Sequence, residues 1–196
     1  LALFADKVII ELNLAHNPNL EGLHDIYIPG ERPNRQPIPL LKVDDRIGTG
    51  AIPIDPAKIA AIVVTNQPDS YSTVTPPDDE TQAIANHLIH FFKNEVDAGR
   101  LSNSLGPLQA GIGNIANAVM CGLIDSPFEN LVMYSEVLQD STFDLIDAGK
   151  MVFASGCSIT LSERCNNRVF GNLEKYKDKL VLRPQEISNH PELVRR

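Results

Sequence analysis

Apolar residues near the start of the chain fall in two short continuous runs, at residues 8–12 and 59–64. Runs of this length that contain β-branched residues indicate strands. Continuous rather than alternating apolar character is typical of strands covered on both faces, as in parallel sheets. Both segments are therefore predicted to be buried strands.

Residues 13–56, between these strands, are rich in Pro, Gly and Asn and show no apolar periodicity. This composition predicts an ordered but irregular loop. Loops of such length are unusual in a compact domain and more often have a function than not.

A helix is predicted from residue 79 onward, because Asp78, Asp79 and Glu80 put negative charge at its positive end and Gly99 is a typical terminator. Its apolar residues recur at helical spacing and so share one face. They are Ile84, Leu88, Phe91, Phe92 and Val96.

Strand and helix patterns alternate through the rest of the chain, which predicts an α/β fold with a mainly parallel sheet and flanking helices. In such sheets ligands bind beyond the carboxyl ends of the strands. We divide the chain into a strand with a long connection, 1–56, and an α/β domain, 57–196. The predicted strands are 108–110, 131–135, 151–154 and 180–182, and the helices are 114–123, 142–148, 161–166 and one from 191.

The chain has 196 residues, 43% hydrophobic content and a net charge of -8, which together indicate a globular protein. The negative charge argues against nucleic-acid binding, which depends on clustered Lys and Arg. No apolar run approaches the roughly 20 residues that span a bilayer. Three cysteines without a CxxC spacing predict neither a disulfide framework nor a zinc site, and favour a reducing compartment.

A glycine turn follows the strand predicted at residues 108–110. Glycines allow a ligand to approach the backbone, and free amides at the next helix start can bind an anion or an oxyanion. The alternative is that the glycines only make the turn. The turn consists of Gly111, Ile112, Gly113, Asn114 and Ile115.

Glu136 follows the strand predicted at residues 131–135. An acidic side chain in that position is either turned to solvent or retained for chemistry, because an unpaired buried carboxylate is costly. Ser188 and Asn189 precede Pro191, which is typical of the first turn of a helix. Capping of that helix is the simplest explanation for Ser188 and also an explanation for Asn189.

Other candidate groups have structural explanations. His87 and His90 are three residues apart on the predicted helix, but no third metal ligand accompanies them, so we expect solvent exposure and no metal site. Cys157 has no evident activating base and is expected to be a small buried residue. The segment Asp44, Asp45 and Arg46 is expected to clamp a substrate or to form an internal salt bridge.

Three segments together resemble the acetyl-CoA hydrolase/transferase family, and most closely its succinyl-CoA:acetate CoA-transferases. They are residues 108–119 (LQAGIGNIANAV), 134–140 (YSEVLQD) and 182–191 (LRPQEISNHP). Residues 20–25 (LEGLHD) and 43–50 (VDDRIGTG) extend the resemblance toward the start.

The resemblance implies a role for each matching residue. Glu136 corresponds to the nucleophile that forms a mixed anhydride and then a glutamyl-CoA thioester. The glycine turn corresponds to the CoA-binding stretch, with the Ile112 amide as an oxyanion donor, and Asn189 contacts the acyl or carboxylate group. The family's second oxyanion donor lies in a glycine-rich loop that does not follow here.

The same resemblance implies a CoA-transferase-like fold in which two α/β halves face each other. The chain opens without Met and stops at Arg195 and Arg196 just inside a predicted helix, so we expect a fragment holding the start of the second half.

The first functional hypothesis is transfer of CoA between an acyl-CoA and a carboxylate, with acetyl- or succinyl-CoA, acetate or succinate as substrates. A hydrolase that uses the same glutamate, and a fragment that only binds CoA or has a structural role, are the alternatives. CoA is expected as a co-substrate and not as a permanently bound cofactor. A homodimer is implied, in the bacterial cytoplasm or, for a fungal member, in mitochondria, without nucleic-acid or membrane partners.

Overall fold

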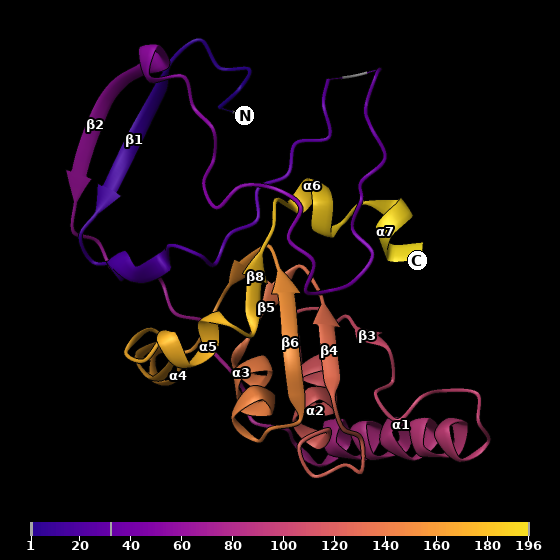
Figure 1. Cartoon of the computed structure of the whole chain (residues 1–196). Coiled ribbons are helices and arrows are strands. Elements are labelled where there is room, and N and C mark those ends of the chain that lie inside the picture. The colour runs from indigo at the N-terminus through magenta and orange to yellow at the C-terminus, as the bar shows by residue number, and fades with distance from the viewer. Residues whose placement is uncertain (1, 32, 196) are drawn as a thin grey trace.

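The computed structural model describes residues 2–31 and 33–195. At its centre is a four-stranded sheet of β3 (Pro107–Leu108), β4 (Leu131–Tyr134), β6 (Met151–Gly156) and β8 (Leu180–Leu182), ordered β3-β4-β6-β8 (Figure 1). All three neighbouring pairs are parallel. The predicted α/β class with a parallel sheet is confirmed.

Helices connect these strands. The connecting helices are α2 (Asn114–Gly122), α3 (Asp140–Asp147), α4 (Glu163–Phe170) and α5 (Glu174–Lys177). The core between sheet and helices contains fully buried strand residues, such as Leu131 and Leu180, and the helical residues Phe143 and Leu145. Tyr176 packs edge-on against Phe143 at a centroid distance of 5.5 Å. The covered sheet agrees with the continuous apolar strands in the sequence.

A second, very short parallel pair was not predicted from the sequence. It consists of β5 (Val137–Leu138) and β7 (Ser158–Ile159), which continue the chain just beyond the carboxyl ends of β4 and β6. Two-residue strands are too short to leave an apolar pattern, so only their backbone hydrogen bonds reveal them.

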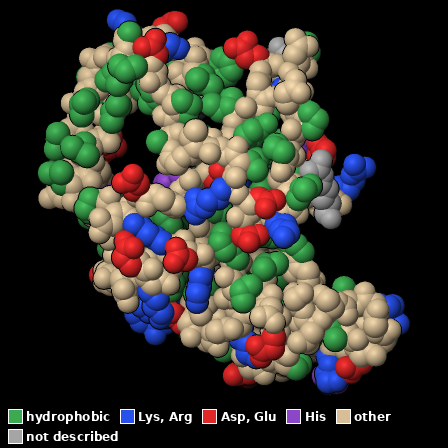
Figure 2. Space-filling model, viewed as in Figure 1, with side chains coloured by type: hydrophobic (Ala, Val, Ile, Leu, Met, Phe, Trp, Pro, Cys, Tyr) green, Lys and Arg blue, Asp and Glu red, His purple; other side chains and the backbone are tan. Residues whose placement is uncertain are grey.

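The strands β1 (Val8–Asn13) and β2 (Ile59–Thr65) form a separate parallel pair, far from the central sheet in Figure 1. Ile9 is 67% exposed, Ile62 62% and Val64 60%, and Figure 2 shows hydrophobic side chains gathered over this pair. The prediction that both strands are buried is therefore wrong. A continuous apolar run shows that a strand could be covered on both faces, but it does not show that other elements of the chain pack on those faces. The division at residue 56 stays a prediction.

Helix α1 (Asp79–Asp97) begins and ends where the sequence predicted. The Asp78 carboxylate accepts the Thr81 amide at 2.8 Å, and the Asp78 amide donates to Thr81 Oγ1 at 3.0 Å, which together form a capping box. Gly99 follows with a φ of 70°, as glycine terminators do. The predicted apolar face is only partly covered, since Phe91 is 53% exposed. No helix of the described residues is both long and apolar enough to cross a membrane.

The long connection between β1 and β2 is irregular, as predicted. Among its described residues, the regular elements are two single 3-10 turns, η1 (Pro18–Leu20) and η2 (Pro56–Lys58), and two isolated bridges. Thr49 and Ile26 exchange backbone hydrogen bonds of 2.7 and 3.0 Å, which closes the middle of the connection into a loop. Gly48 lies so close to the Ile26 carbonyl that a Cβ atom would overlap it.

Arg183 ties this loop to the sheet, because its buried guanidinium pairs with the buried Asp25 carboxylate. The same guanidinium donates to Ser155 Oγ at 3.0 Å and to the carbonyls of Val43 and Asp45. Asp25 also accepts the amides of Ile47 and Gly48, at 3.0 and 2.6 Å. The Asp25 carboxylate thus accepts from the Arg183 guanidinium and from two loop amides in one hydrogen-bond network.

A salt bridge within the segment 44–46 is not observed among the described residues, and its expected contact with a substrate stays a prediction. Asp45 accepts the amides of Leu41 and Lys42, at 2.9 and 2.7 Å, and so closes a tight turn. Arg46 donates to the backbone carbonyls of His24 and Leu180. Among the described residues, the expected internal salt bridge is replaced by the pair of Asp25 with Arg183, which lies more than a hundred positions away and leaves no local signal in the sequence.

We predict that Asp25→Ala lowers the free energy of unfolding by about 3–5 kcal/mol, because it leaves the Arg183 charge buried without a partner. Urea denaturation of the two proteins measures the difference. Asp97→Asn, which breaks the exposed pair with Lys93 on α1, is the matched control and should leave the midpoint almost unchanged. An equally small effect of both variants would contradict this role for the buried pair.

Candidate functional site

The carboxyl ends of the central strands meet at one edge of the sheet, where α6 lies in Figure 1. Two hydrogen bonds join the glycine turn after β3 to the chain after β4. Ser135 Oγ donates to the Ala110 carbonyl at 3.1 Å, and Gln139 Nε2 donates to the Gly111 carbonyl at 3.2 Å. The two predicted site segments are therefore neighbours in the fold.

Glu136 lies between β4 and β5, and its backbone is fixed from the next strand. Its carbonyl oxygen accepts the amides of Cys157, at 2.7 Å, and Ser158, at 3.2 Å. The residue is partly buried, so it is neither enclosed in the core nor fully exposed to solvent.

Two side-chain amides hold the Glu136 carboxylate, one on each oxygen. Gln185 Nε2 donates to Oε1 at 2.8 Å, and Asn189 Nδ2 donates to Oε2 at 3.2 Å. Hydrogen bonds to an ionised acceptor are stronger than those between neutral groups. These two bonds fix the orientation of the carboxylate. Of the two explanations given for Glu136, a side chain that is simply turned to solvent is therefore not the one observed.

Gln185 is the first residue of α6 (Gln185–Ser188), a single turn that was not predicted, and Asn189 directly follows its last residue. The Asn189 amide closes this turn on the Gln185 carbonyl at 2.9 Å. Residues four apart lie on the same side of a helix, and Ile187, on the other side, is buried. The spacing Gln-x-x-x-Asn with an apolar residue between them is the signal that could have identified Gln185.

The capping role expected for Ser188 and Asn189 is not observed. Helix α7 (Pro191–Arg195) has His190 before it, whose Nδ1 accepts the Glu192 amide at 3.3 Å. Ser188 is the last residue of α6, and its buried hydroxyl makes no hydrogen bond within the usual geometric limits.

A cavity of about 490 Å³ lies beside Glu136 and is large enough for a small ligand. The connecting loop contributes to its lining, and so do Ser188 at the end of α6, Asn189 and two residues of α7, Leu193 and Val194. Lys42 is the one basic residue among the described residues that line it. The loop lining consists of Leu40, Leu41, Lys42 and Val43.

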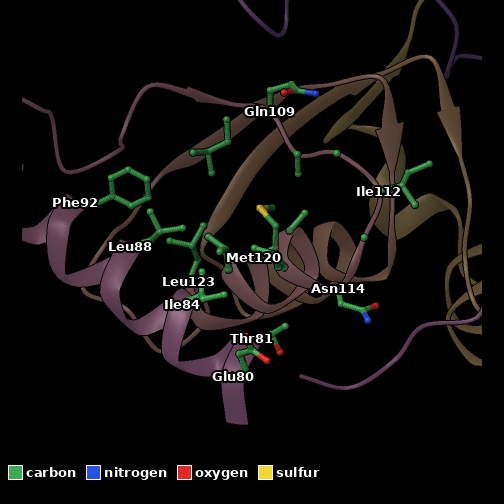
Figure 3. Close-up of a pocket in the computed structure, with 17 residues that line it drawn as sticks. Glu80, Thr81, Ile84, Leu88, Phe92, Gln109, Ile112, Asn114, Met120 and Leu123 are labelled. Carbon is green, nitrogen blue, oxygen red and sulfur yellow. The ribbon is translucent and has the colours of Figure 1, made fainter. Parts of the chain in front are cut away.

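A longer groove of about 1000 Å³ runs between α1, α2 and the glycine turn (Figure 3). Phe92 lies near one end and Ile112 near the other, with Met120 between them. Its lining is mainly apolar. Gln109 lines both the groove and the Glu136 cavity, so the glycine turn and Glu136 open into adjacent cavities that meet at this residue.

The glycine turn itself is exposed. Ile112 is 76% and Ile115 51% exposed. Gly113 has a φ of 146° and a ψ of 166°, a region that essentially only glycine adopts, and it directly precedes Asn114 at the start of α2. Gly111 has an ordinary φ and open space around it. The backbone conformation therefore requires only the second glycine.

Burial shifts the ionisation of two groups beside Glu136. It raises the pKa of Tyr134 to about 12, and the Tyr134 hydroxyl donates to the Ile187 carbonyl at 2.8 Å. Burial also raises the pKa of the Cys157 thiol. Ser188 lowers this pKa and the negative charge of Glu136 raises it. Cys157 is half-buried, not fully buried as predicted, and its protonated thiol is a poor nucleophile.

Within residues 2–31 and 33–195 no group of three or more His, Cys, Asp or Glu side chains is arranged to hold a metal. His87 and His90 are both exposed on α1, as the spacing argument predicted.

The chain matches the model of the acetyl-CoA hydrolase/transferase N-terminal domain over residues 1–64. It is 50% identical to the acetyl-CoA hydrolase of Saccharomyces cerevisiae, 51% to that of Candida glabrata and 49% to that of Neurospora crassa, in each case over 98% of this chain. The chain covers 36% of the length of each of these relatives.

Solved structures show the same type of fold. RipA from Yersinia pestis superposes with a TM-score of 0.54 at 18% identity, covering 70% of this chain and 30% of that one. A 4-hydroxybutyrate CoA-transferase from Porphyromonas gingivalis gives a TM-score of 0.51 at 20% identity, over 70% and 33% of the two chains. The predicted CoA-transferase-like fold is confirmed.

We predict that Tyr134 makes the free energy of unfolding fall as the pH rises from about 10 to about 12. The folded state holds the phenolic proton more tightly than the unfolded state, so its contribution is complete below pH 10 and is lost as the pH passes the folded pKa. Tyr134→Phe should lose about 1 kcal/mol at neutral pH with the hydrogen bond and should show a shallower decline at high pH. Urea denaturation at several pH values tests this. Parallel curves for the two proteins would contradict it.

Gly113→Ala should destabilise the fold by about 1–3 kcal/mol, because alanine is strained in the backbone conformation of Gly113. Gly111→Ala is the matched control, in the same turn, and should stay within about 0.5 kcal/mol of the unchanged protein. Thermal unfolding followed by circular dichroism distinguishes the two. Equal losses of stability in the two variants would contradict the prediction that only Gly113 requires glycine.

Proposed function

Because the chain is 50% identical over 98% of its length to the acetyl-CoA hydrolase of Saccharomyces cerevisiae and matches the acetyl-CoA hydrolase/transferase N-terminal domain over residues 1–64, we propose that it belongs to this family and carries the nucleophile of an enzyme that transfers CoA between an acyl-CoA and a carboxylate. The observation that supports this most directly is the Glu136 carboxylate, held by two amides at the edge of a ligand-sized cavity. The chain covers 36% of its curated relatives, so the activity is proposed for the protein that contains it.

In this proposal Glu136 attacks the thioester carbonyl and becomes an acyl-glutamyl anhydride, which the CoA thiolate converts into a glutamyl thioester. A carboxylate suits these steps because each intermediate is an activated acyl group, so the energy of the thioester is preserved. Asn189 faces the cavity beside Glu136 and is proposed to contact the acyl or carboxylate group of the substrate. Lys42, in the loop that lines the same cavity, adds a positive charge that favours anionic substrates.

We propose that CoA reaches Glu136 from the groove beside the glycine turn, since Gln109 belongs to both cavities. The apolar lining suits the pantetheine arm better than the phosphates, because Glu80 is the only charged residue among the described lining residues. The amide of Ile112, in the turn before α2, is the proposed oxyanion donor. CoA acts here as a co-substrate.

Hydrolysis is the second candidate function, and it is favoured by the relatives, which are named acetyl-CoA hydrolases. The same nucleophile serves both reactions, and the difference lies in whether a carboxylate or water resolves the glutamyl thioester. The fungal relatives support the mitochondrial rather than the bacterial alternative for the compartment, and we retain the homodimer as part of the proposal.

Glu136→Gln in the complete protein should lower turnover at least about a thousandfold while the fold is retained, because the amide is similar in shape but not nucleophilic. The unchanged protein, incubated with acetyl-CoA, should carry a CoA adduct on the peptide that contains Glu136, detectable by mass spectrometry. Glu129→Gln, on the surface, is the control and should turn over normally. Near-normal transfer by Glu136→Gln would reject the assignment.

Transfer and hydrolysis separate in an acceptor titration. A transferase should lose acetyl-CoA at a rate that rises with added succinate, with one succinyl-CoA formed for each acetyl-CoA consumed. A hydrolase should release free CoA at a rate that is indifferent to the acceptor. If neither rate is measurable but calorimetry shows CoA binding, the non-catalytic alternative is the one supported.

A further inference from the structure

The two oxygens of the Glu136 carboxylate have different surroundings. Asn189, which donates to Oε2, lines the cavity together with Glu136. Gln185, which donates the shorter bond to Oε1, is not among the described residues that line this cavity. Oε2 therefore faces the space where a substrate binds, and Oε1 faces the start of α6.

A carboxylate would normally exchange its two oxygens by rotating about the Cγ–Cδ bond, since terminal torsions of this kind have a broad, roughly two-fold profile. Rotation of Glu136 would break the hydrogen bonds from both Gln185 and Asn189. Charge-assisted bonds are about twice as strong as neutral ones, and Gln185 is fixed by the α6 turn, which Tyr134 and the buried Ile187 hold on the sheet.

From this geometry we infer that Gln185 is a positioning residue that keeps Oε1 on Glu136 through the whole reaction, so that Oε2 alone is the attacking and exchanging atom. The inference rests on the proposed function of Glu136. It adds a residue that the sequence did not indicate and assigns different roles to two oxygens that are chemically identical in solution.

The bonds can be followed step by step. Oε2 attacks the acyl carbon, the carbon–sulfur bond breaks, and CoA leaves as the thiolate. The thiolate then attacks Glu136 Cδ, the Cδ–Oε2 bond breaks, and the donor acid leaves with Oε2. The glutamyl thioester retains Oε1 as its carbonyl oxygen.

An acceptor carboxylate attacks Cδ in turn and expels the thiolate, which next attacks the acceptor's acyl carbon. The bond between that carbon and the bridging oxygen breaks, and the bridging oxygen stays on Glu136 as the new Oε2. Each turnover therefore replaces one glutamate oxygen by an oxygen from the acceptor. Negative charge develops on Oε1 whenever Cδ is attacked, and the Gln185 amide is placed to stabilise it.

Isotope exchange tests the inference without depending on rate. The complete protein is cycled many times with acetyl-CoA and excess acetate labelled with oxygen-18, returned to the free carboxylate by the labelled acetate, and digested for mass spectrometry. The peptide that carries Glu136 should gain one labelled oxygen and no more. In Gln185→Leu, cycled for the same number of turnovers, it should gain two, because the carboxylate is then free to rotate.

Gln82→Leu is the matched control, since the exposed side chain of this glutamine on α1 bonds only Asn86 among the described residues; it should gain one label. Gln185→Met replaces the leucine variant if that variant does not fold. We also expect Gln185→Leu to lower kcat about a hundredfold, as loss of an oxyanion donor does, with little change in KM.

Each pattern of labelling has one meaning. Two labels in the unchanged protein, or one label in both Gln185 variants, would overturn the role of Gln185 while leaving Glu136 as the nucleophile. No label in any protein that turns over would instead reject the proposed function, because the glutamate would then never form the anhydride.

Discussion

The buried pair between Arg183 and Asp25 is the interaction on which the site depends. Arg183 directly follows β8 and lies two positions before Gln185, whereas Asp25 belongs to the long connection. The guanidinium bonds that carboxylate, a hydroxyl at the end of β6 and two loop carbonyls. Burial lowers the pKa of Arg183 and Asp25 opposes this, so the charge is tolerated only because its donors are used.

This network explains how an irregular loop can form one wall of a precise cavity. Residues 40–43 have no regular secondary structure, but the carbonyl of Val43 is bonded by Arg183 and the amides before it by Asp45. The residues after β8 that line the cavity begin with Ser188, at the end of α6. The loop and the start of this segment are both joined to the sheet by Arg183, where β6 and β8 end.

The apolar surface is distributed unevenly over the chain. Most of the central sheet is covered, with Val152 exposed on β6, whereas the β1–β2 pair and the outer face of α1 carry exposed Ile, Val, Leu and Phe side chains (Figure 2). In the described residues no layer packs on that pair. The well-covered part of the chain is also the part that holds Glu136, Gln185 and Asn189, which is consistent with the need to position reacting groups on rigid elements.

The sequence by itself determined the α/β class, the alternation of the four main strands with the longer helices, the limits of α1 and the position of Glu136 at the end of a strand. These features follow from local patterns, because apolar periodicity, caps and glycines act over a few residues. It did not determine what covers β1 and β2, or that Gln185 and Asn189 share one face of a single turn. It also did not pair Arg183 with Asp25. Those contacts join residues far apart in the chain, and their free energy exists only once the sheet has brought its strand ends together, so the tertiary structure alone decided them.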